Sequence, residues 1–294
     1  MATIQKTVIT VIICIFCINI QNANSKQFVL KVMNYNVKGV PVFWYWHFRH
    51  KYIGHHLVTL KESGKGADII ALQEMMSRRT RKIHKITKYP NRDQGPKGKW
   101  FRTSSGLEIL SEYPFLETSH DIVFNKCKNS DCLSRKGVQH VKIHIPGLPF
   151  PIDFYNTHLN AGGIENTEIR YSQIKQLNSF IEKTRTPNIP MIITGDFNFK
   201  QAQKEYPVFT SKYNPENAAY KCGISQSCEG HPNPYEIWLH HLIDHQFYHP
   251  GSNNKITITP IYYDHYFTDI KVGKYMKVEL SDHPAVMVHY LIDY

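Results

Sequence analysis

The sequence predicts an α/β fold in which two β-sheets pack face to face and helices cover the outside. Apolar segments of strand length outnumber the segments with helical spacing along the chain. Few, well-separated helices among many strands favour a layered sandwich. Residues 139–145 also alternate strictly between apolar and polar side chains. Such half-buried alternation is typical of an antiparallel or sandwich sheet rather than of a fully wrapped parallel sheet.

The expected elements follow one another over most of the chain. Strands are predicted over residues 28–35, 68–74, 105–110, 139–145, 152–156 and 285–291, and further strands begin at Met191 and Leu242. Helices are predicted over residues 55–61, before a Gly-Lys-Gly stop, and over residues 167–183, where apolar side chains recur at helical spacing. Residues 206–234 are rich in Pro, Asn and Gly and predict a long loop. Residues 256–280 predict a β-hairpin region with exposed aromatic side chains.

Residues 1–25 have the pattern of a secretory signal peptide. Lys6 precedes an almost wholly apolar run over residues 7–20, and small residues follow at Ala23 and Ser25. The run is short for a membrane span, and no other stretch of the sequence is apolar enough to cross a bilayer. We therefore expect a secreted protein whose mature chain, residues 26–294, forms one domain and acts as a monomer.

The cysteines indicate the compartment in which the protein works, and the net charge indicates the chemical class of its partners. Beyond the signal segment, four cysteines fall into two local pairs, Cys127 with Cys132 and Cys222 with Cys228. In an oxidising compartment each pair could close a small loop, although four cysteines allow three connectivities. The formal net charge of +11 favours anionic partners. Nucleic acid, acidic lipid head groups and phosphate substrates all meet that condition.

Polar side chains stand at the ends of the predicted strands. Singly, each has an ordinary explanation as a turn residue or a solvated group. The strand ends of an α/β layer, however, are where ligands and chemistry are usually found. The side chains in question are Asn36, Glu74, His158, Asp196, Asn198, Asp244, Asp282 and His283. Together they offer the hard oxygen ligands that Mg²⁺ prefers, with histidines that can act as a general base or hold phosphate oxygens.

These positions resemble the ordered motifs of the endonuclease/exonuclease/phosphatase superfamily. The matching stretches are Asn34-Tyr-Asn36, Leu72-Gln-Glu74, Thr157-His-Leu159, Gly195-Asp-Phe-Asn198, Leu242-Ile-Asp244 and Ser281-Asp-His283. They occur in the superfamily's order over nearly the whole mature chain. The resemblance implies a four-layer α/β/β/α sandwich with the site at one end of the two sheets. No Ser, Cys or Lys nucleophile follows the same pattern, so the predicted chemistry is direct in-line attack of water on phosphorus.

The resemblance assigns the metal and the base. Glu74 would bind Mg²⁺ directly, with Asn36 beside it, and another divalent cation such as Mn²⁺ or Co²⁺ could take the same place. His283 would be the general base that takes a proton from the attacking water. Asp196 would orient that water or the base.

The resemblance also assigns the groups around the phosphate. His158 and Asn198 would hold phosphate oxygens as charge builds up in the transition state. Asp244 would support His158. Asp282 would orient His283 or touch a metal ion.

Two further stretches resemble the secreted, bacterial-type neutral sphingomyelinases. One is Ser105-Gly-Leu107 with Ser111-x-Tyr-Pro114, and the other is Asp131-Cys-Leu-Ser-Arg-Lys-Gly-Val138. Lys136, beside Gly137, could place a cation against a phosphate that the backbone can approach closely. Asn160 stands where that group usually has Gln, and we assign it with Lys136 to substrate binding.

The sequence therefore predicts a secreted, Mg²⁺-dependent phosphodiesterase that hydrolyses sphingomyelin to ceramide and phosphocholine. Such an enzyme works at a membrane surface and needs aromatic side chains that can sit at the interface. The candidates are Tyr262, Tyr263, Tyr266 and Phe267, with residues 43–46 as a second set. The alternative is a secreted nuclease that would hold DNA phosphates with the basic residues of segments 78–88 and 97–102. A binding module without activity is disfavoured, because no catalytic position is substituted.

Overall fold

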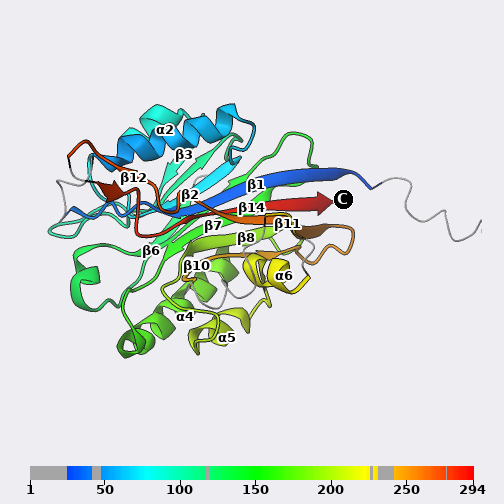
Figure 1. Cartoon of the computed structure of the whole chain (residues 1–294). Helices are drawn as coiled ribbons and strands as arrows, with labels where there is room; N and C mark the ends of the chain where they lie inside the picture. Colours follow the sequence, from blue (N-terminus) through cyan, green and yellow to red (C-terminus); the bar gives the residue numbers. More distant parts are fainter. Residues whose placement is uncertain (1–24, 42–47, 117–118, 226–227, 231–241, 276) are drawn as a thin grey trace, which may run out of the picture.

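The computed structural model describes residues 25–41, 48–116, 119–225, 228–230, 242–275 and 277–294 (Figure 1). The predicted signal segment, apart from Ser25, and the second set of aromatic candidates at residues 43–46 lie outside the described residues. Among the helices that are described, none is both long and apolar enough to cross a bilayer.

Two six-stranded sheets form the centre of the molecule. The first has the order β11 (Thr257–Tyr266), β14 (Ala285–Asp293), β1 (Gln27–Asn36), β2 (Ile69–Gln73), β4 (Glu108–Ser111) and β3 (Asn91–Gln94). The second has the order β5 (His120–Val123), β6 (Gly137–Ile143), β7 (Ile152–His158), β8 (Met191–Asp196), β10 (Asp244–His249) and β9 (Glu216–Asn217). Only β1–β2 and β7–β8 pair in parallel among these strands. The predicted pair of mostly antiparallel sheets is confirmed.

Helices cover the outer faces of both sheets (Figure 1). The first sheet carries α2 (Arg49–Glu62) and α3 (Lys82–Thr87), and the second carries α4 (Thr167–Thr184) and α5 (Glu205–Thr210). A further helix, α6 (Ala218–Ser225), packs beside β11 and β10. Short elements complete the chain: the 3₁₀ helices η2 (Asn129–Leu133) and η3 (Ile164–Asn166) and the hairpin of β12 (Lys271–Val272) and β13 (Val278–Glu279). The predicted four-layer α/β/β/α sandwich is confirmed.

The two-residue period of the strands sorts side chains between the layers. In β1, Leu30 and Val32 face the core between the sheets, whereas Met33 and Tyr35 pack under the helices of the first sheet. The same alternation continues to Asn36, which it turns toward the second sheet. The pattern that buries the core therefore also carries the polar strand ends into the seam between the sheets.

Helix α4 follows the predicted spacing. Ile174, Leu177 and Ile181 recur at intervals of three and four residues, and all three are fully buried against the second sheet. This cover also explains His140, which the alternation of residues 139–145 placed on a polar face. His140 is buried because α4 closes over the sheet, and its Nε2 lies 2.9 Å from the carboxylate of Asp153.

The prediction of a long loop over residues 206–234 is wrong for its described part, which contains most of α5, all of α6 and strand β9. The Pro- and Asn-rich composition of this segment predicts a loop, but a few of its apolar side chains are buried in the core. Phe209 packs into the core beneath α5, and Cys222 joins the core between the sheets. Tertiary burial thus overrides a weak local preference for helix. Both predicted disulfides, Cys127–Cys132 and Cys222–Cys228, are confirmed.

The aromatic segment near the end of the chain also differs from the prediction. Instead of an exposed hairpin, β11 is a ten-residue edge strand along β14, and only β12 and β13 form a hairpin. Tyr263 is 1% exposed in the core between the sheets, so its assignment as a membrane-facing residue is wrong. Tyr262, Tyr266 and Phe267 are half-buried and pack against the core beneath α2. A shift in the pairing register between Pro260 and Tyr262 moves the alternation of β11 by one residue, so Tyr263 faces the same core as Ile258.

Candidate active site

The polar strand ends meet at one edge of the sandwich. Strands β1, β2, β7 and β8 end there, while β10 and β14 begin there. Sheet register fixes three of the side chains in a row, because Asp196 pairs directly with His158 on one side and with Asp244 on the other. The first sheet supplies Asn36 at the end of β1, and Glu74 directly follows β2. The predicted site residues therefore come from both sheets and face each other across the seam.

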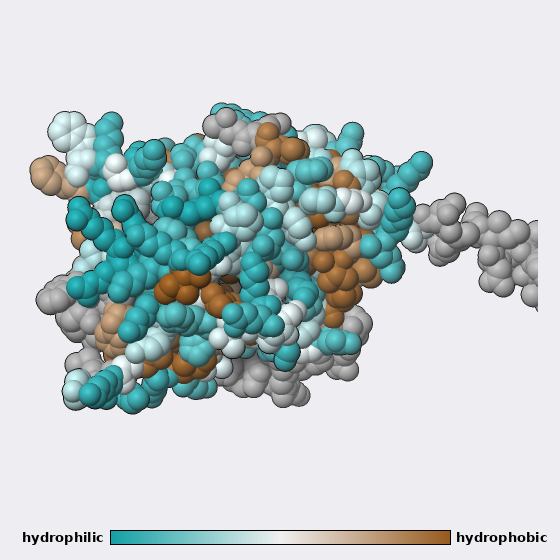
Figure 2. Space-filling view, turned by 90° about the horizontal axis from the view of Figure 1, so that it is seen from above, coloured by the Kyte–Doolittle hydropathy of each residue, from teal (hydrophilic) through white to brown (hydrophobic). Residues whose placement is uncertain are grey.

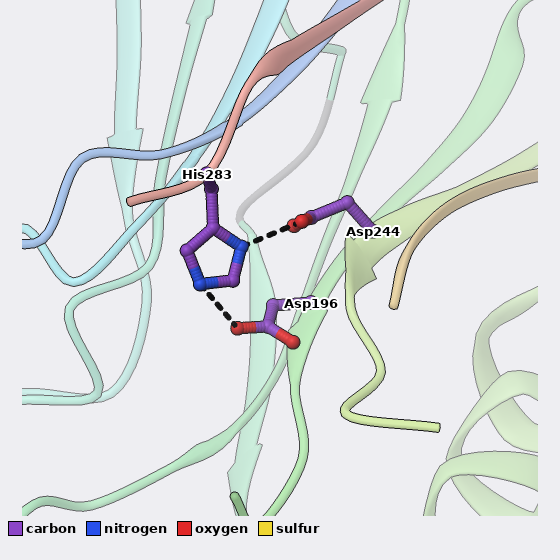
Figure 3. Close-up of side chains that lie close together, drawn as sticks. All are labelled: Asp196, Asp244 and His283. Carbon is purple, nitrogen blue, oxygen red and sulfur yellow. Dashed lines mark hydrogen bonds and ion pairs between the residues drawn. The ribbon is translucent and has the colours of Figure 1, made fainter. Parts of the chain in front are cut away.

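His283 and Asp244 form a tight pair (Figure 3). The imidazole Nδ1 donates to Asp244 Oδ2 at 2.6 Å, and Nε2 lies 3.9 Å from Asp196 Oδ2. The sequence predicts that Asp244 supports His158 and that Asp282 orients His283 or touches a metal ion. Asp244 supports His283 instead, so its predicted partner is wrong, and Asp282 makes no hydrogen bond to the His283 ring. The carboxylate of Asp282 instead pairs with Lys38 Nζ at 2.6 Å.

Charge holds His283 and Asp196 in opposite ionisation states. Burial raises the pKa of Asp244, although the charge of His283 opposes that shift. Burial lowers the pKa of His283. The negative charges of Asp244 and, to a smaller extent, Asp196 raise it by more than burial lowers it, and the resulting pKa is about 10. Burial raises the pKa of Asp196, but His158, His283 and Lys136 lower it, so that its pKa lies well below the usual range. Without a metal ion, the site therefore holds an imidazolium beside ionised Asp196.

Because of the raised pKa of His283 beside Asp244, we expect the free energy of unfolding to fall as the pH rises. Because the folded-state pKa of His283, about 10, exceeds its ordinary value of 6.5, the charged imidazole stabilises the fold fully below pH 6.5, and this contribution is lost as the pH rises through 10. In chelator, this group alone should lower the free energy of unfolding by about 1.4 kcal/mol per pH unit between those values. Denaturant unfolding across that range measures the slope, which Asp244→Asn should flatten. Equal slopes in both proteins would contradict the ion pair.

Asp196 links the two sheets at the centre of the site. Its Oδ2 accepts a hydrogen bond from Asn36 Nδ2 at 3.0 Å and lies 3.2 Å from His158 Nε2. Its Oδ1 accepts the backbone N–H of Asn198 at 3.0 Å. The preceding Gly195 has φ +153°, and a Cβ there would lie 2.1 Å from the carbonyl oxygen of Thr157. Only glycine lets β8 approach β7 closely enough to place Asp196 here.

Two site residues have backbone conformations that are rare for residues other than glycine. Glu74 has φ +60° and Asn198 has φ +52°, both in the left-handed region. Such conformations cost free energy and cluster at functional sites, although Asn tolerates them better than Glu does. At Glu74, the turn holds Oε1 at 3.2 Å from Asn36 Nδ2. The side chain is half-buried at the edge of the seam.

The donor set fits a divalent cation. Asp196, Asp244 and His283 offer ligand atoms that all lie within 4.8 Å of one another, and the Glu74 carboxylate stands on the other side of Asn36. Asp244 Oδ1 is buried and has no hydrogen-bond partner among the described residues. Carboxylate oxygens are the ligands that hard cations prefer. A cation bound here would polarise phosphate oxygens and offset their charge.

The expected substrate contacts lie beside the site but are largely occupied. Lys136 is buried, and its Nζ donates to Asp131 Oδ2 at 2.8 Å and to the Leu159 carbonyl at 3.0 Å. Asn198 Nδ2 donates to the same carbonyl at 3.1 Å. Asn160 is buried, accepts the N–H of Lys128 and donates to the carbonyl of Ala161. These side chains fix the turn that follows His158.

A layer of buried amides beneath the site was not predicted. Gln73 Nε2 donates to Asn34 Oδ1 and Asn156 Oδ1, both at 2.8 Å, and Asn156 Nδ2 donates to the Leu72 carbonyl at 3.0 Å. On the other side, Gln246 Nε2 donates to the Val286 carbonyl at 2.9 Å. These bonds connect the two sheets directly below the candidate site residues. Amides at inward positions of otherwise apolar strands were the available signal, because buried amides require partners.

Solved structures share this fold across nearly the whole chain. A mutant form of beta toxin from Staphylococcus aureus, with bound magnesium ions, superposes with a TM-score of 0.66, 19% sequence identity and coverage of 89% of this chain and 99% of that one. A humanized D. rerio TDP2 gives the same TM-score with 14% identity, covering 89% of this chain and 98% of its own. Likeness at this level of identity shows the fold alone.

Among proteins of assigned activity, two sphingomyelinases are similar in sequence. The Mycobacterium bovis "Sphingomyelinase" is 24% identical over 210 residues, which are 65% of this chain and 38% of that protein. The Listeria ivanovii "Sphingomyelinase C" is 29% identical over 139 residues, 46% of this chain and 41% of that protein. The matches thus span about two fifths of the length of these relatives.

The family model described as "Endonuclease/Exonuclease/phosphatase family" matches residues 33–283. That range runs from within β1, just before Asn36, to His283, and so contains all the candidate metal and catalytic residues. It also includes both sheets except for the whole of β14 and the beginning of β1. The chain belongs to the endonuclease/exonuclease/phosphatase family.

Proposed function

We propose that this chain is a secreted, Mg²⁺-dependent phosphodiesterase that hydrolyses sphingomyelin to ceramide and phosphocholine. The observation that carries the chemistry is the His283–Asp244 pair, whose imidazole faces Asp196 across the seam. A histidine held in this way by a carboxylate is a general base for an attacking water. The two similar sphingomyelinases support the choice of substrate.

In the proposed reaction, some of the site residues transfer a proton and others stabilise the charge on the phosphate. His283 Nε2 takes a proton from water as the water oxygen bonds to phosphorus. The bond from phosphorus to the ceramide oxygen breaks with its electron pair on that oxygen, which takes up a proton from solvent to give the ceramide hydroxyl. Asp244 holds Nδ1–H and stabilises the imidazolium that forms. His158, 1% exposed and beside Asp196, donates to phosphate oxygen with Asn198 nearby. Glu74 would hold Mg²⁺ with Asn36 beside it.

The pKa of the base must fall for this role at neutral pH. In the metal-free site the carboxylates hold the pKa of His283 at about 10. A cation near Asp196 offsets part of that negative charge and so lowers the pKa. Metal binding should therefore release protons, as it does wherever ligands or their neighbours must deprotonate.

The two disulfides and the apolar N-terminal segment support secretion, and we propose that the enzyme acts as a monomer at a lipid surface. Disulfides persist in oxidising compartments and are rare in the cytosol. The basic net charge of +11 suits a surface that carries anionic head groups.

One observation favours a nuclease as the second candidate. Arg78, Arg81 and Lys97 line a surface pocket of about 380 Å³ that Met75 and Glu108 also line. Met75 directly follows Glu74, so this basic pocket opens beside the candidate metal ligand. Arginine and lysine at such a place could hold the phosphates of a nucleic acid backbone.

Parallel assays on sphingomyelin vesicles and plasmid DNA test the choice between the two substrates. With Mg²⁺ present, we expect release of phosphocholine from the vesicles and little or no nicking of the DNA. The His283→Ala variant, prepared in the same way, reports any contaminating activity. Efficient DNA cleavage without phosphocholine release would reverse the assignment and leave only the shared phosphodiester chemistry.

A further inference from the structure

Exposed hydrophobic side chains gather at the edge of the sandwich that carries the active site. Phe101 is 98% exposed, Trp100 is 87% exposed and Leu133 is 60% exposed. Figure 2, which looks down on the face that α2 covers, shows a mostly hydrophilic surface interrupted by hydrophobic side chains. Single exposed apolar residues are ordinary, but an adjacent Trp and Phe with almost no cover are not.

Sheet register places these side chains at that edge. The loop with Trp100 and Phe101 joins β3 to β4, and β4 begins opposite the end of β2, where Glu74 follows. Leu133 closes η2 just before β6, which begins beside the end of β7 at His158. Ile164, 81% exposed, begins η3 in the loop that follows β7. The exposed apolar groups thus lie on loops at the same edge of the sandwich as the candidate site.

Hydrogen bonds fix the 99–102 turn, which carries the two aromatic rings. Lys99 and Arg102 exchange backbone hydrogen bonds of 3.1 and 3.0 Å, so Trp100 and Phe101 occupy the tip. The Arg102 guanidinium donates to the Ser134 carbonyl at 2.6 and 3.1 Å. The backbone N–H of residue 103 donates to the Leu133 carbonyl at 2.8 Å. The Cys127–Cys132 disulfide closes the segment immediately before Leu133.

Basic side chains surround this tip. Lys97 and Lys99 precede it, Arg102 follows it, and Arg135 donates to the Lys97 carbonyl. Lys97 also lines the basic pocket of about 380 Å³. Each Lys or Arg close to an anionic leaflet is attracted to it, and aromatic rings are accommodated at the interface between head groups and acyl chains.

We propose that the 99–102 turn docks onto a lipid bilayer containing anionic lipid, with Trp100 and Phe101 at the interface and the basic residues among the head groups. The proposal rests on the proposed function and names the surface that would bring the site to its substrate. A lipid partner is favoured over a nucleic acid because aliphatic Leu133 and Ile164 share the same edge. Bases stack on planar rings, whereas a bilayer accepts aliphatic and aromatic groups alike.

The test compares the wild type with a Trp100→Asn, Phe101→Ser double variant. Asn suits position 100 because Trp100 has φ +55°, in the left-handed region that Asn tolerates. Sedimentation with vesicles of phosphatidylcholine and phosphatidylserine, which contain no sphingomyelin, measures docking without the active site's substrate. We expect binding to weaken about tenfold or more, as for loss of two interfacial rings. Hydrolysis of a soluble choline phosphodiester should stay within about twofold of wild type.

Two controls separate the tip from general effects. Tyr220→Ser removes another exposed aromatic ring, 43% exposed on α6, and should leave vesicle binding unchanged. Lys97→Gln with Lys99→Gln should weaken binding to vesicles with phosphatidylserine more than to vesicles of phosphatidylcholine alone. Circular dichroism and thermal unfolding of each variant check the fold, and the charge variant tests the same surface if the double variant does not fold.

The outcomes distinguish the docking surface from the activity. Vesicle binding that depends on Trp100 and Phe101, without sphingomyelin hydrolysis by the wild type, would support docking and contradict the proposed substrate. Wild-type vesicle affinity in a folded double variant would overturn the docking proposal, whatever the activity. Loss of single-stranded DNA binding in that variant, with vesicle binding intact, would assign the turn to nucleic acid instead.

Discussion

Replacing His283 by alanine is expected to lower the rate of phosphodiester hydrolysis by about a hundred- to ten-thousandfold, the usual loss when a general base is removed. Asp244 holds Nδ1 at 2.6 Å, while Nε2 lies 3.9 Å from Asp196 Oδ2, beyond hydrogen-bond distance. That spacing leaves Nε2 as the ring atom that can take a proton from water. Alanine adds no bulk at the edge of the seam but removes the partner of buried Asp244, so thermal unfolding must confirm that the variant is folded at the assay pH. Initial rates at saturating substrate measure the effect.

A matched histidine serves as the control for this substitution. His289 lies on β14, is half-buried and stacks on Tyr262 at 4.3 Å, outside the catalytic cluster. His289→Ala should keep its rate within about twofold, because nothing near the phosphate position changes. If His283→Ala retained a rate within a few-fold of wild type, the base would lie elsewhere, and His158 would be the first alternative.

Chelation is expected to abolish hydrolysis, and Mg²⁺ to restore it. Glu74→Gln should raise the Mg²⁺ concentration needed for half-maximal rate by about tenfold or more, because an amide is a weaker ligand for a hard cation than a carboxylate. Gln keeps the size of the side chain and the same left-handed φ of +60°. The substitution therefore tests charge at this position rather than the turn itself. Titration of activity with Mg²⁺ after treatment with EDTA gives the Mg²⁺ concentration for half-maximal rate in the wild type and in Glu74→Gln.

A carboxylate far from the site controls for the loss of one negative charge. Glu62 ends α2 and is exposed, and Glu62→Gln should leave the Mg²⁺ requirement unchanged. Full activity of the wild type in excess chelator would overturn the metal assignment. Unchanged Mg²⁺ dependence in Glu74→Gln would instead move the ligand to the cluster of Asp196, Asp244 and His283.

The sequence predicts much of this architecture because strand alternation and strand ends are local properties. Ile192 faces the core, and two steps of the same period carry the chain to Asp196, so the apolar pattern of β8 also orients its terminal carboxylate. Helix α4 is equally local, since Ile174 and Leu177 repeat at helical spacing. The fold class and the edge at which the site residues meet follow from such patterns.

What could not be predicted depends on contacts between distant segments. The pairing of Asp244 with His283 joins β10 of one sheet to the residues before β14 of the other, and no spacing in the sequence encodes that contact. Gln73 and Asn156 bond across the seam for the same reason. The Pro-, Asn- and Gly-rich composition around Cys222 predicts a loop, whereas Cys222 lies on α6 and is buried by packing that local composition does not reveal.

The position of β14 has a consequence for how activity arises during synthesis. This strand follows every other strand in the chain, yet it lies inside its sheet, between β11 and β1. His283 stands immediately before it, at the edge that β14 ties down. A growing chain can therefore complete the second sheet, with Asp196 and Asp244 in place, while His283, the proposed general base, is still untethered. Hydrolytic activity should therefore appear in one step, when β14 inserts between β11 and β1. A chain truncated within β14 should have no activity rather than reduced activity.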